Sequence, residues 1–327
     1  MSSVWQSNNL LKKWEKKNQK ILVQSDFTYD LGDPLSDPLI EAISKDIGVK
    51  KEFIYLGAGS CQLISGIMSI PCWDKVYLSQ IEFGLYERAA EIYGKTLLRI
   101  KGMHIVDFMK NIKKIKSTEK DLLCISSPRW FTGEMFSENQ VMELLKTFKG
   151  TIMIDEAYVD YSNNETGMMK LCLENNRIIV TRSYSKKFLA SGLRTGYLIT
   201  TKNIAGLRTT IIPTHSVSSY SANFFIKLLS DDKILKSFYE TRQYMKKNRD
   251  LIFDEFCKNK KIKVIKSNAN FITLIFNSVL DFENVYSVLK DYAGIQRFER
   301  ECLFIKIWVN NETFSKLLIE KIKEVLK

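Results

Sequence analysis

One short stretch of the chain gathers residue types that hold a phosphate and form a carbon–nitrogen bond. Residues 181–200 read TRSYSKKFLASGLRTGYLIT. Ser183 and Ser185 can donate to phosphate oxygens, and Arg194 adds a permanent positive charge with a planar set of donors. Lys186 follows directly after Ser185, and an amine that is partly removed from water can act as a Schiff-base nucleophile. The stretch therefore predicts a nucleophilic lysine beside a bound phosphate.

Three further stretches carry weaker signals, because each has an ordinary structural explanation when it is taken alone. An acidic residue at a strand end is usually a helix cap, a glycine pair before a helix is usually a capped start, and a phenylalanine is usually core. A helix start is also a place where phosphate binds well. The stretches are IDEAYVDYS with Asp155 and Tyr158, GAGSCQLISGIM with Gly59, Ser60 and Cys61, and IEFGLYERAAEIYG with Phe83.

Together and in this order, the stretches resemble the signature of the class I/II, fold-type I aminotransferases. In that signature Ser-x-Ser-Lys is followed by a small and apolar run and then by Gly-Leu-Arg-x-Gly. The chain is most similar to the histidinol-phosphate aminotransferase branch, from about Leu56 to the C-terminus. The resemblance implies that pyridoxal 5′-phosphate (PLP) is the cofactor and that Lys186 holds it as a Schiff base. Lys186 is chosen over Lys187 because it keeps the family's spacing to Arg194.

The resemblance also implies roles for single residues. Asp155 pairs with the ring nitrogen and keeps it protonated, which makes the ring an electron sink. Tyr158 hydrogen-bonds the ring hydroxyl, and Phe83 stacks on the ring. Lys186, Asp155 and Tyr158 are thus the expected catalytic residues. The further expected cofactor contacts are Gly59, Ser60, Cys61, Ser183, Ser185 and Arg194.

Two departures from the family pattern affect the substrate side. The family's Asn-Pro-x-Asn-Pro-x-Gly loop appears as SPRWFTG, so Trp130 replaces the asparagine that hydrogen-bonds the ring hydroxyl. The family's substrate-carboxylate arginine appears as Lys306 in FIKIWVNN, and a lysine lacks the two-pronged donor set of an arginine. We therefore expect Trp130 to contact the cofactor, and Lys306, helped by the nearby Arg297, to bind the substrate.

These residues predict an enzyme that moves an amino group between an amino acid, or a phosphorylated or anionic amine, and a 2-oxo acid. Two alternatives remain open. The changed substrate side also fits another PLP reaction, such as decarboxylation of an amino acid or phospho-amino acid, elimination, or oxidation. A non-catalytic relative is the weaker alternative, because a pure binder has little use for Lys186, Asp155 and Arg194 together.

The elements that must position these residues alternate between strands and helices. Apolar runs predict strands at residues 76–79, 122–126, 151–155, 178–182 and 196–200, and amphipathic stretches predict helices at residues 60–69, 85–93 and 138–148. Such alternation is typical of an α/β three-layer sandwich around a mainly parallel sheet, here the PLP-dependent transferase fold type I. We expect a large domain over residues 39–233. A smaller α+β domain is expected from residues 1–38 and 234–327.

Composition also bears on whether the chain binds nucleic acid or metal, contains disulfides, or is a secreted or membrane protein. The chain has 327 residues, a net charge of +12 and six cysteines without a C-x-x-C pair. Its lysines alternate with apolar residues at helical spacing, which favours solvated helix faces over a nucleic-acid groove. No metal site, disulfide framework, signal peptide or membrane span is expected, so a cytoplasmic protein is the default expectation. The family resemblance implies a homodimer.

Overall fold

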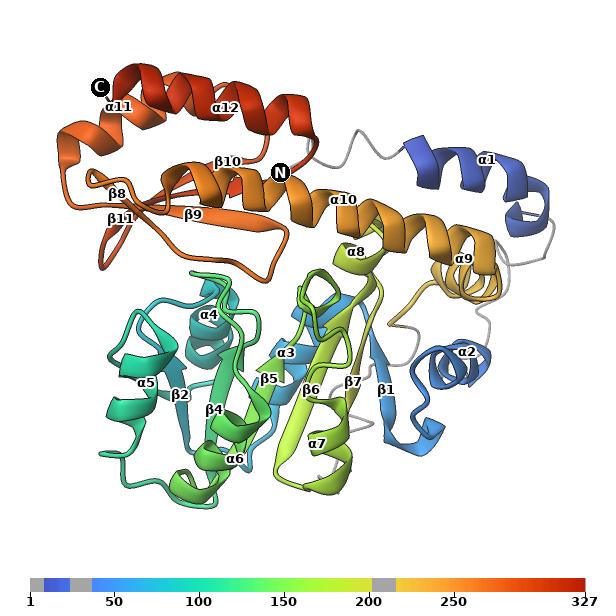
Figure 1. The fold of residues 1–327 in the computed structure, drawn as a ribbon. Helices are drawn as coiled ribbons and strands as arrows, with labels where there is room; N and C mark the ends of the chain where they lie inside the picture. Colours follow the sequence, from blue (N-terminus) through green and yellow to red (C-terminus); the bar gives the residue numbers. More distant parts are fainter. Residues whose placement is uncertain (1–8, 24–36, 202–215, 327) are drawn as a thin grey trace.

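The computed structural model describes residues 9–23, 37–201 and 216–326 (Figure 1). A seven-stranded sheet of order β1-β7-β6-β5-β4-β2-β3 forms the large domain. Its strands are β1 Ile54–Gly57, β2 Lys75–Ser79, β3 Thr96–Ile100, β4 Asp121–Ser126, β5 Thr151–Asp155, β6 Ile178–Ser183 and β7 Gly196–Ile199. Only β7 runs antiparallel to its neighbours, so the sheet is mainly parallel, as the sequence predicts.

The central strands are buried on both faces, which requires helices on both sides of the sheet. Along β4, for example, Leu123 and Ile125 belong to one apolar cluster, while Leu122 and Cys124 belong to the other. Helices α3 (Gly59–Ser69) and α4 (Gly84–Ile92) pack on the second cluster. The first cluster is covered by α2 Asp37–Ile47, α5 Ile105–Ile112, α6 Glu138–Thr147, α7 Met169–Glu174 and α9 Ser219–Leu229.

The smaller domain is an antiparallel sheet of order β10-β11-β9-β8 with its own apolar core. Its strands are β8 Ile262–Val264, β9 Phe271–Phe276, β10 Ile295–Glu299 and β11 Leu303–Trp308, and helices α11 (Val279–Leu289) and α12 (Glu312–Val325) cover it. Helix α10 (Asp232–Phe256) runs from the large domain to this sheet, as Figure 1 shows. The predicted fold class, a three-layer α/β domain with a smaller α+β domain, is confirmed.

The described N-terminal helix, α1 (Asn9–Val23), lies against the large domain. Trp14 belongs to the large domain's apolar cluster, and its indole donates to Asp231 at 2.9 Å. Tyr220 of α9 donates to Glu15 at 2.8 Å. These contacts do not support the prediction that residues 1–38 join the small domain, although residues 1–8 and 24–36 lie outside the described part. Among the described residues, no helix is long and apolar enough to cross a membrane.

Candidate active site

The carboxyl ends of β4, β5 and β6 meet at one edge of the large sheet. Register places Ser126 beside Asp155, and Asp155 beside Thr181. A cavity of about 780 Å³ opens above this edge and is closed on its far side by β10 and the end of β11. The predicted residues that line it are Ser60, Cys61, Phe83, Trp130, Asp155, Tyr158, Ser183, Ser185, Lys186 and Arg194. These ten predicted residues therefore share one cavity, whereas Gly59, Arg297 and Lys306 are not among the residues that line it.

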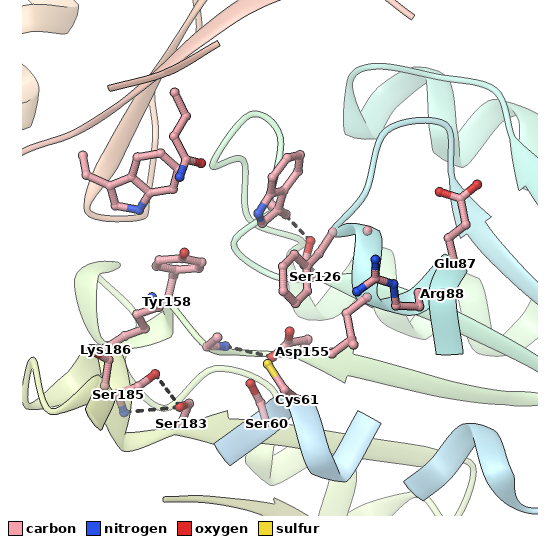
Figure 2. A pocket seen from close by; sticks show the side chains of 18 of the residues that line it. Ser60, Cys61, Glu87, Arg88, Ser126, Asp155, Tyr158, Ser183, Ser185 and Lys186 are labelled. Carbon is pink, nitrogen blue, oxygen red and sulfur yellow. Dashed lines mark hydrogen bonds between the residues drawn. The ribbon is translucent and has the colours of Figure 1, made fainter. Parts of the chain in front are cut away.

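Asp155 is a buried carboxylate at the floor of this cavity (Figure 2). It accepts hydrogen bonds from the hydroxyl of Thr181 at 3.1 Å, the amide of Ala157 at 3.2 Å and the hydroxyl of Tyr86 at 3.0 Å. Burial raises the pKa of Asp155 to about 6, and the nearby Glu82 adds to the rise. No cation among the described residues forms an ion pair with it, so the site suits a cationic ligand atom.

Tyr86 is a functional residue that the sequence reasoning passed over. Its ring is fully buried on α4, and its hydroxyl fixes one carboxylate oxygen of Asp155. Burial and the neighbouring Asp155 raise the pKa of Tyr86 well above its ordinary value, so it stays a hydrogen-bond donor. The available signal was its place in IEFGLYERAAEIYG, where it matches a family aromatic residue.

Small and polar residues gather at the opposite end of the cavity floor from Trp130. The hydroxyls of Ser183 and Ser185 lie 2.7 Å apart at the start of the short helix α8 (Tyr184–Lys187). Helix α3 begins at Gly59 without a side-chain cap, so its first amides can donate to an anion. A Cβ atom on Gly59 would lie 2.7 Å from Nη2 of Arg194, so the glycine leaves room for that guanidinium.

Lys186 reaches the cavity, whereas Lys187 does not. The amine of Lys186 lies 5.5 Å from the ring centre of Tyr158, and both side chains line the cavity. Its backbone carbonyl accepts a hydrogen bond from Tyr161 at 3.0 Å, which fixes α8 in place. Lys187 turns to the other side of α8 and pairs with Asp46 at 2.8 Å.

Aromatic rings form the wall of the cavity opposite the phosphate-type end. Phe83 caps the start of α4, and its ring centre lies 6.3 Å from that of Trp130. Trp130 also packs edge-on against Phe298 of β10 at 5.3 Å. Trp308 at the end of β11 completes the wall. Trp130 thus lines the cavity, where its ring packs against Phe83 and Phe298 but supplies no carboxamide.

Lys306 is not among the residues that line the cavity. It is fully buried behind Trp130, to whose carbonyl oxygen its amine donates at 2.6 Å. The amine also lies 3.7 Å from the ring centre of Phe271 and 4.0 Å from that of Trp130. Burial, together with the charge of Lys186, lowers the pKa of Lys306 well below its ordinary value. The structure therefore does not bring Lys306 to the substrate space.

Arg297 points away from the cavity as well. Ile295, Gln296 and Phe298 of β10 line the cavity, while Arg297 packs over the rings of Phe282 and Tyr286 of α11 and pairs with Glu283 at 2.8 Å. The cations that do line the cavity mouth are Arg88 of α4 and Arg300 after β10. The two-residue period of side chains along β10 is the sequence signal that could have placed Arg300, rather than Arg297, at the cavity.

The match to known proteins agrees with this geometry. The family model "Aminotransferase class I and II" matches residues 4–315, so the chain belongs to that family. PLP is the cofactor of this aminotransferase family.

Individual relatives and solved structures are similar to the chain over most of its length. A histidinol-phosphate aminotransferase of Thermoanaerobacter pseudethanolicus is 26% identical over 321 residues, which cover 95% of this chain and 88% of the relative. The structure resembles a histidinol-phosphate aminotransferase from Sinorhizobium meliloti in complex with PLP, with a TM-score of 0.76, 16% identity, and coverage of 97% and 87%. It also resembles an L-threonine-O-3-phosphate decarboxylase from Porphyromonas gingivalis, with a TM-score of 0.80, 15% identity, and coverage of 95% of each chain.

The residues present fit PLP. Asp155 is a buried carboxylate that lacks a cation, which a protonated pyridine nitrogen would supply. The cradle between Gly59 and Arg194, which a Cβ atom would fill, suits a phosphate. No group of three or more His, Cys, Asp or Glu side chains that could hold a metal ion occurs in the described ranges.

Proposed function

We propose that this protein is a PLP-dependent aminotransferase that uses Lys186 as its catalytic lysine. One observation carries the proposal: Lys186 and Asp155 face a single cavity from two adjacent strand ends. An amine at one end and a buried carboxylate at the other are the two groups that a pyridine aldehyde requires. Their order and spacing in the sequence match the family's motif, which supports the assignment.

Different residues of the chain bind the cofactor and transfer the proton. Ser183, Ser185 and Arg194, with the first amides of α3, hold the phosphate, and Asp155 keeps a proton on the ring nitrogen. When bound, PLP supplies an electron sink for the electrons left on the substrate's Cα. Lys186 removes the proton from Cα as a general base. Tyr158 holds the ring hydroxyl, and Phe83 covers one ring face.

The substrate that we propose is an amino acid or an amine with an anionic group. Arg88 and Arg300 line the cavity mouth and are exposed, and no carboxylate among the described residues pairs with either of them. The guanidinium of Arg300 donates to the carbonyl of Glu82 at 3.4 Å and lies 5.9 Å from the ring centre of Trp130. The histidinol-phosphate aminotransferases named above act on histidinol phosphate, which is an amine with an anionic phosphate group.

Decarboxylation of an amino acid or phospho-amino acid is the second candidate. It is favoured by the burial of Lys306 behind Trp130, because the described cavity then has no cation at the position where the family holds the substrate carboxylate. Elimination or oxidation would use the same cofactor site. A non-catalytic relative is the weakest candidate, since Lys186, Asp155 and Arg194 are all kept in place.

A mixture of the PLP-loaded protein, a panel of amino acids and a panel of 2-oxo acids tests the proposal. Transamination predicts that a new amino acid forms as one 2-oxo acid is consumed, at a matching rate. Release of carbon dioxide without a new amino acid would instead establish the decarboxylase. Lys187→Met is the matched control and should keep the activity, whereas Lys186→Met should lose it.

Three finer expectations stay predictions. The homodimer implied by the family predicts a particle of twice 38.0 kDa in light scattering. The cytoplasmic location and the absence of nucleic-acid binding rest on composition alone.

A further inference from the structure

Helix α10 carries three cations on its buried face. Arg242, Lys246 and Arg249 follow one another at spacings of four and three residues, so they lie on one face of the helix. They are only 5%, 8% and 6% exposed. Arginine and lysine side chains are rarely buried to this extent unless they are paired. The proposed reaction uses none of the three, so their burial requires another explanation.

The guanidinium of Arg242 joins two turns that carry expected catalytic residues. Its Nη1 atom donates to the carbonyl of Lys187 at 3.4 Å, and its Nε atom donates to the carbonyl of Asp160 at 3.2 Å. Lys187 follows Lys186 in α8, which lies beside α10 (Figure 1). Asp160 lies two residues after Tyr158. One buried side chain of α10 therefore contacts the backbone close to both Lys186 and Tyr158.

Helix α8 depends on such contacts because it is a single turn of four residues. A helix this short is not stable by itself, and the last carbonyl groups of a helix have no partner within it. Tyr161 donates to the carbonyl of Lys186 at 3.0 Å, and Arg242 donates to that of Lys187. Leu189 then takes a φ of 55°, a conformation that a leucine adopts at a cost. The end of α8 is thus held by side chains of other elements.

The guanidinium of Arg242 is itself fixed by a carboxylate. Its Nη2 atom pairs with Oε2 of Glu165 at 3.2 Å, and the amine of Lys246 lies 3.8 Å from Oε1 of the same residue. The backbone carbonyl of Glu165 accepts a hydrogen bond from Arg182 of β6 at 3.2 Å. All three nitrogens of Arg242 are therefore engaged, and a charged donor makes stronger hydrogen bonds than a neutral one. Such a side chain fixes the position of the carbonyl groups that it contacts.

We propose that Arg242 is a positioning residue, which holds α8 so that the amine of Lys186 meets the cofactor and the substrate's Cα at the right distance. This inference rests on the proposed function. Arg242 acts only through the backbone, because it is not among the residues that line the cavity. A displacement of about 1 Å at a reacting group can cost about a hundredfold in rate. The arginine therefore affects the rate of the proton transfer more than it affects substrate binding.

Arg242→Met tests the inference in the PLP-loaded protein. Methionine fills much of the buried space but donates no hydrogen bond, so the carbonyl groups of Asp160 and Lys187 lose this donor. The kcat should fall about tenfold or more, while the KM for the amino donor should stay within about threefold of wild type. Arg242→Lys should recover part of the lost kcat, because its amine can still donate to one of the two carbonyl groups.

Hydrogen exchange of the cofactor-free protein gives a readout that does not depend on activity. Without the donor, the backbone amides of residues 184–190 should exchange about tenfold faster in Arg242→Met than in wild type. Arg249→Met is the matched control, because Arg249 is similarly buried on the same face of α10 but donates to the carbonyl of Ala269 at 2.9 Å. Arg249→Met should keep the wild-type kcat and the wild-type exchange over residues 184–190.

A wild-type kcat in Arg242→Met, or an equal loss of kcat in Arg249→Met, would overturn the inference while the proposed function stands. A fall in kcat without faster exchange over residues 184–190 would overturn it as well. If Arg242→Met does not fold, Arg242→Lys decides alone by the same two measurements. A wild-type protein that forms no bond between Lys186 and PLP would overturn the proposed function, and the inference with it.

Discussion

Single residues in this site carry costs that only a ligand relieves. Asp155 is buried with three hydrogen-bond donors but with no cation, and its pKa is raised to about 6. A group of this kind is unfavourable in the empty protein and favourable once a protonated ring nitrogen lies beside it. The affinity of the site for a protonated ring nitrogen therefore comes partly from a carboxylate that is unfavourable in the cofactor-free protein.

Asp155→Asn should make the cofactor-free protein more stable above neutral pH. The pKa of Asp155 rises from 3.8 unfolded to about 6 folded, so the folded state binds this proton more tightly. Stability then falls as pH rises from about 4 to about 6, by up to about 3 kcal/mol, and stays lower above that range. Asparagine removes this loss. Urea unfolding without PLP at several pH values measures it.

The same experiment with PLP is the control. In the presence of PLP the wild type should be more stable than Asp155→Asn, because only the wild type gains the ion pair with the ring nitrogen. A cofactor-free Asp155→Asn protein whose stability changes with pH as steeply as wild type between about pH 4 and 6 would contradict this account.

At the scale of elements, the phosphate end depends on the turn from β1 into α3. Gly59 has a φ of 79°, and its missing side chain lets Arg194 approach the first turn of α3. Arg194 itself has a φ of 47°, a conformation that non-glycine residues adopt at a cost. The side chain of Arg194 donates to the carbonyls of Ser191 and Ala58, and these hydrogen bonds help to offset the backbone strain.

Gly59→Ala should weaken PLP binding by about tenfold or more, because it displaces one charged phosphate ligand. Gly48→Ala is the matched control: its φ is 67°, and an added Cβ atom would meet nothing within 4 Å. Both substitutions should cost about 1 kcal/mol of stability through backbone strain. Only the first should change the dissociation constant of PLP in a fluorescence titration. Equal dissociation constants for PLP in the two variants would rule out a phosphate site between Gly59 and Arg194.

Sequence reasoning predicted the elements that combine strong periodicity with a full set of apolar residues. The predicted strand at 151–155 matches β5 residue for residue, and the one predicted at 122–126 matches β4 to within one residue. It missed β1, which is only four residues long, and it missed β3 and β10, because β3 is a mostly exposed edge strand and the side chains of β10 are all partly or fully exposed. Since β10 was missed, its alternation was missed too, and Arg297 was preferred to Arg300.

At the scale of the whole molecule, the cavity lies between two domains that are joined by aromatic and polar contacts. Lys306 of β11 donates to Trp130 of the large domain, and Thr273 of β9 donates to the carbonyl of Phe131 at 2.6 Å. These contacts hold the loop at residues 127–133 against the small sheet. The sequence placed Lys306 near the site, but only the packing of the two domains shows that its amine is enclosed.

Lys306→Met tests whether this lysine binds substrate or only joins the domains. The enclosed amine predicts a KM for the amino donor within about threefold of wild type and unchanged or higher stability, since an apolar chain fits among the rings. Steady-state kinetics and thermal unfolding check both. A rise in KM by more than about tenfold at unchanged stability would instead assign Lys306 to the substrate carboxylate.

The most direct test of the central claim is to locate the lysine that bonds PLP. The protein is incubated with PLP, reduced with borohydride, digested and analysed by mass spectrometry. The structure predicts the added pyridoxyl phosphate mass on Lys186 in wild type and in Lys187→Met, and no such mass in Lys186→Met. A label on Lys187 or Lys306, or no label in wild type, would contradict the account.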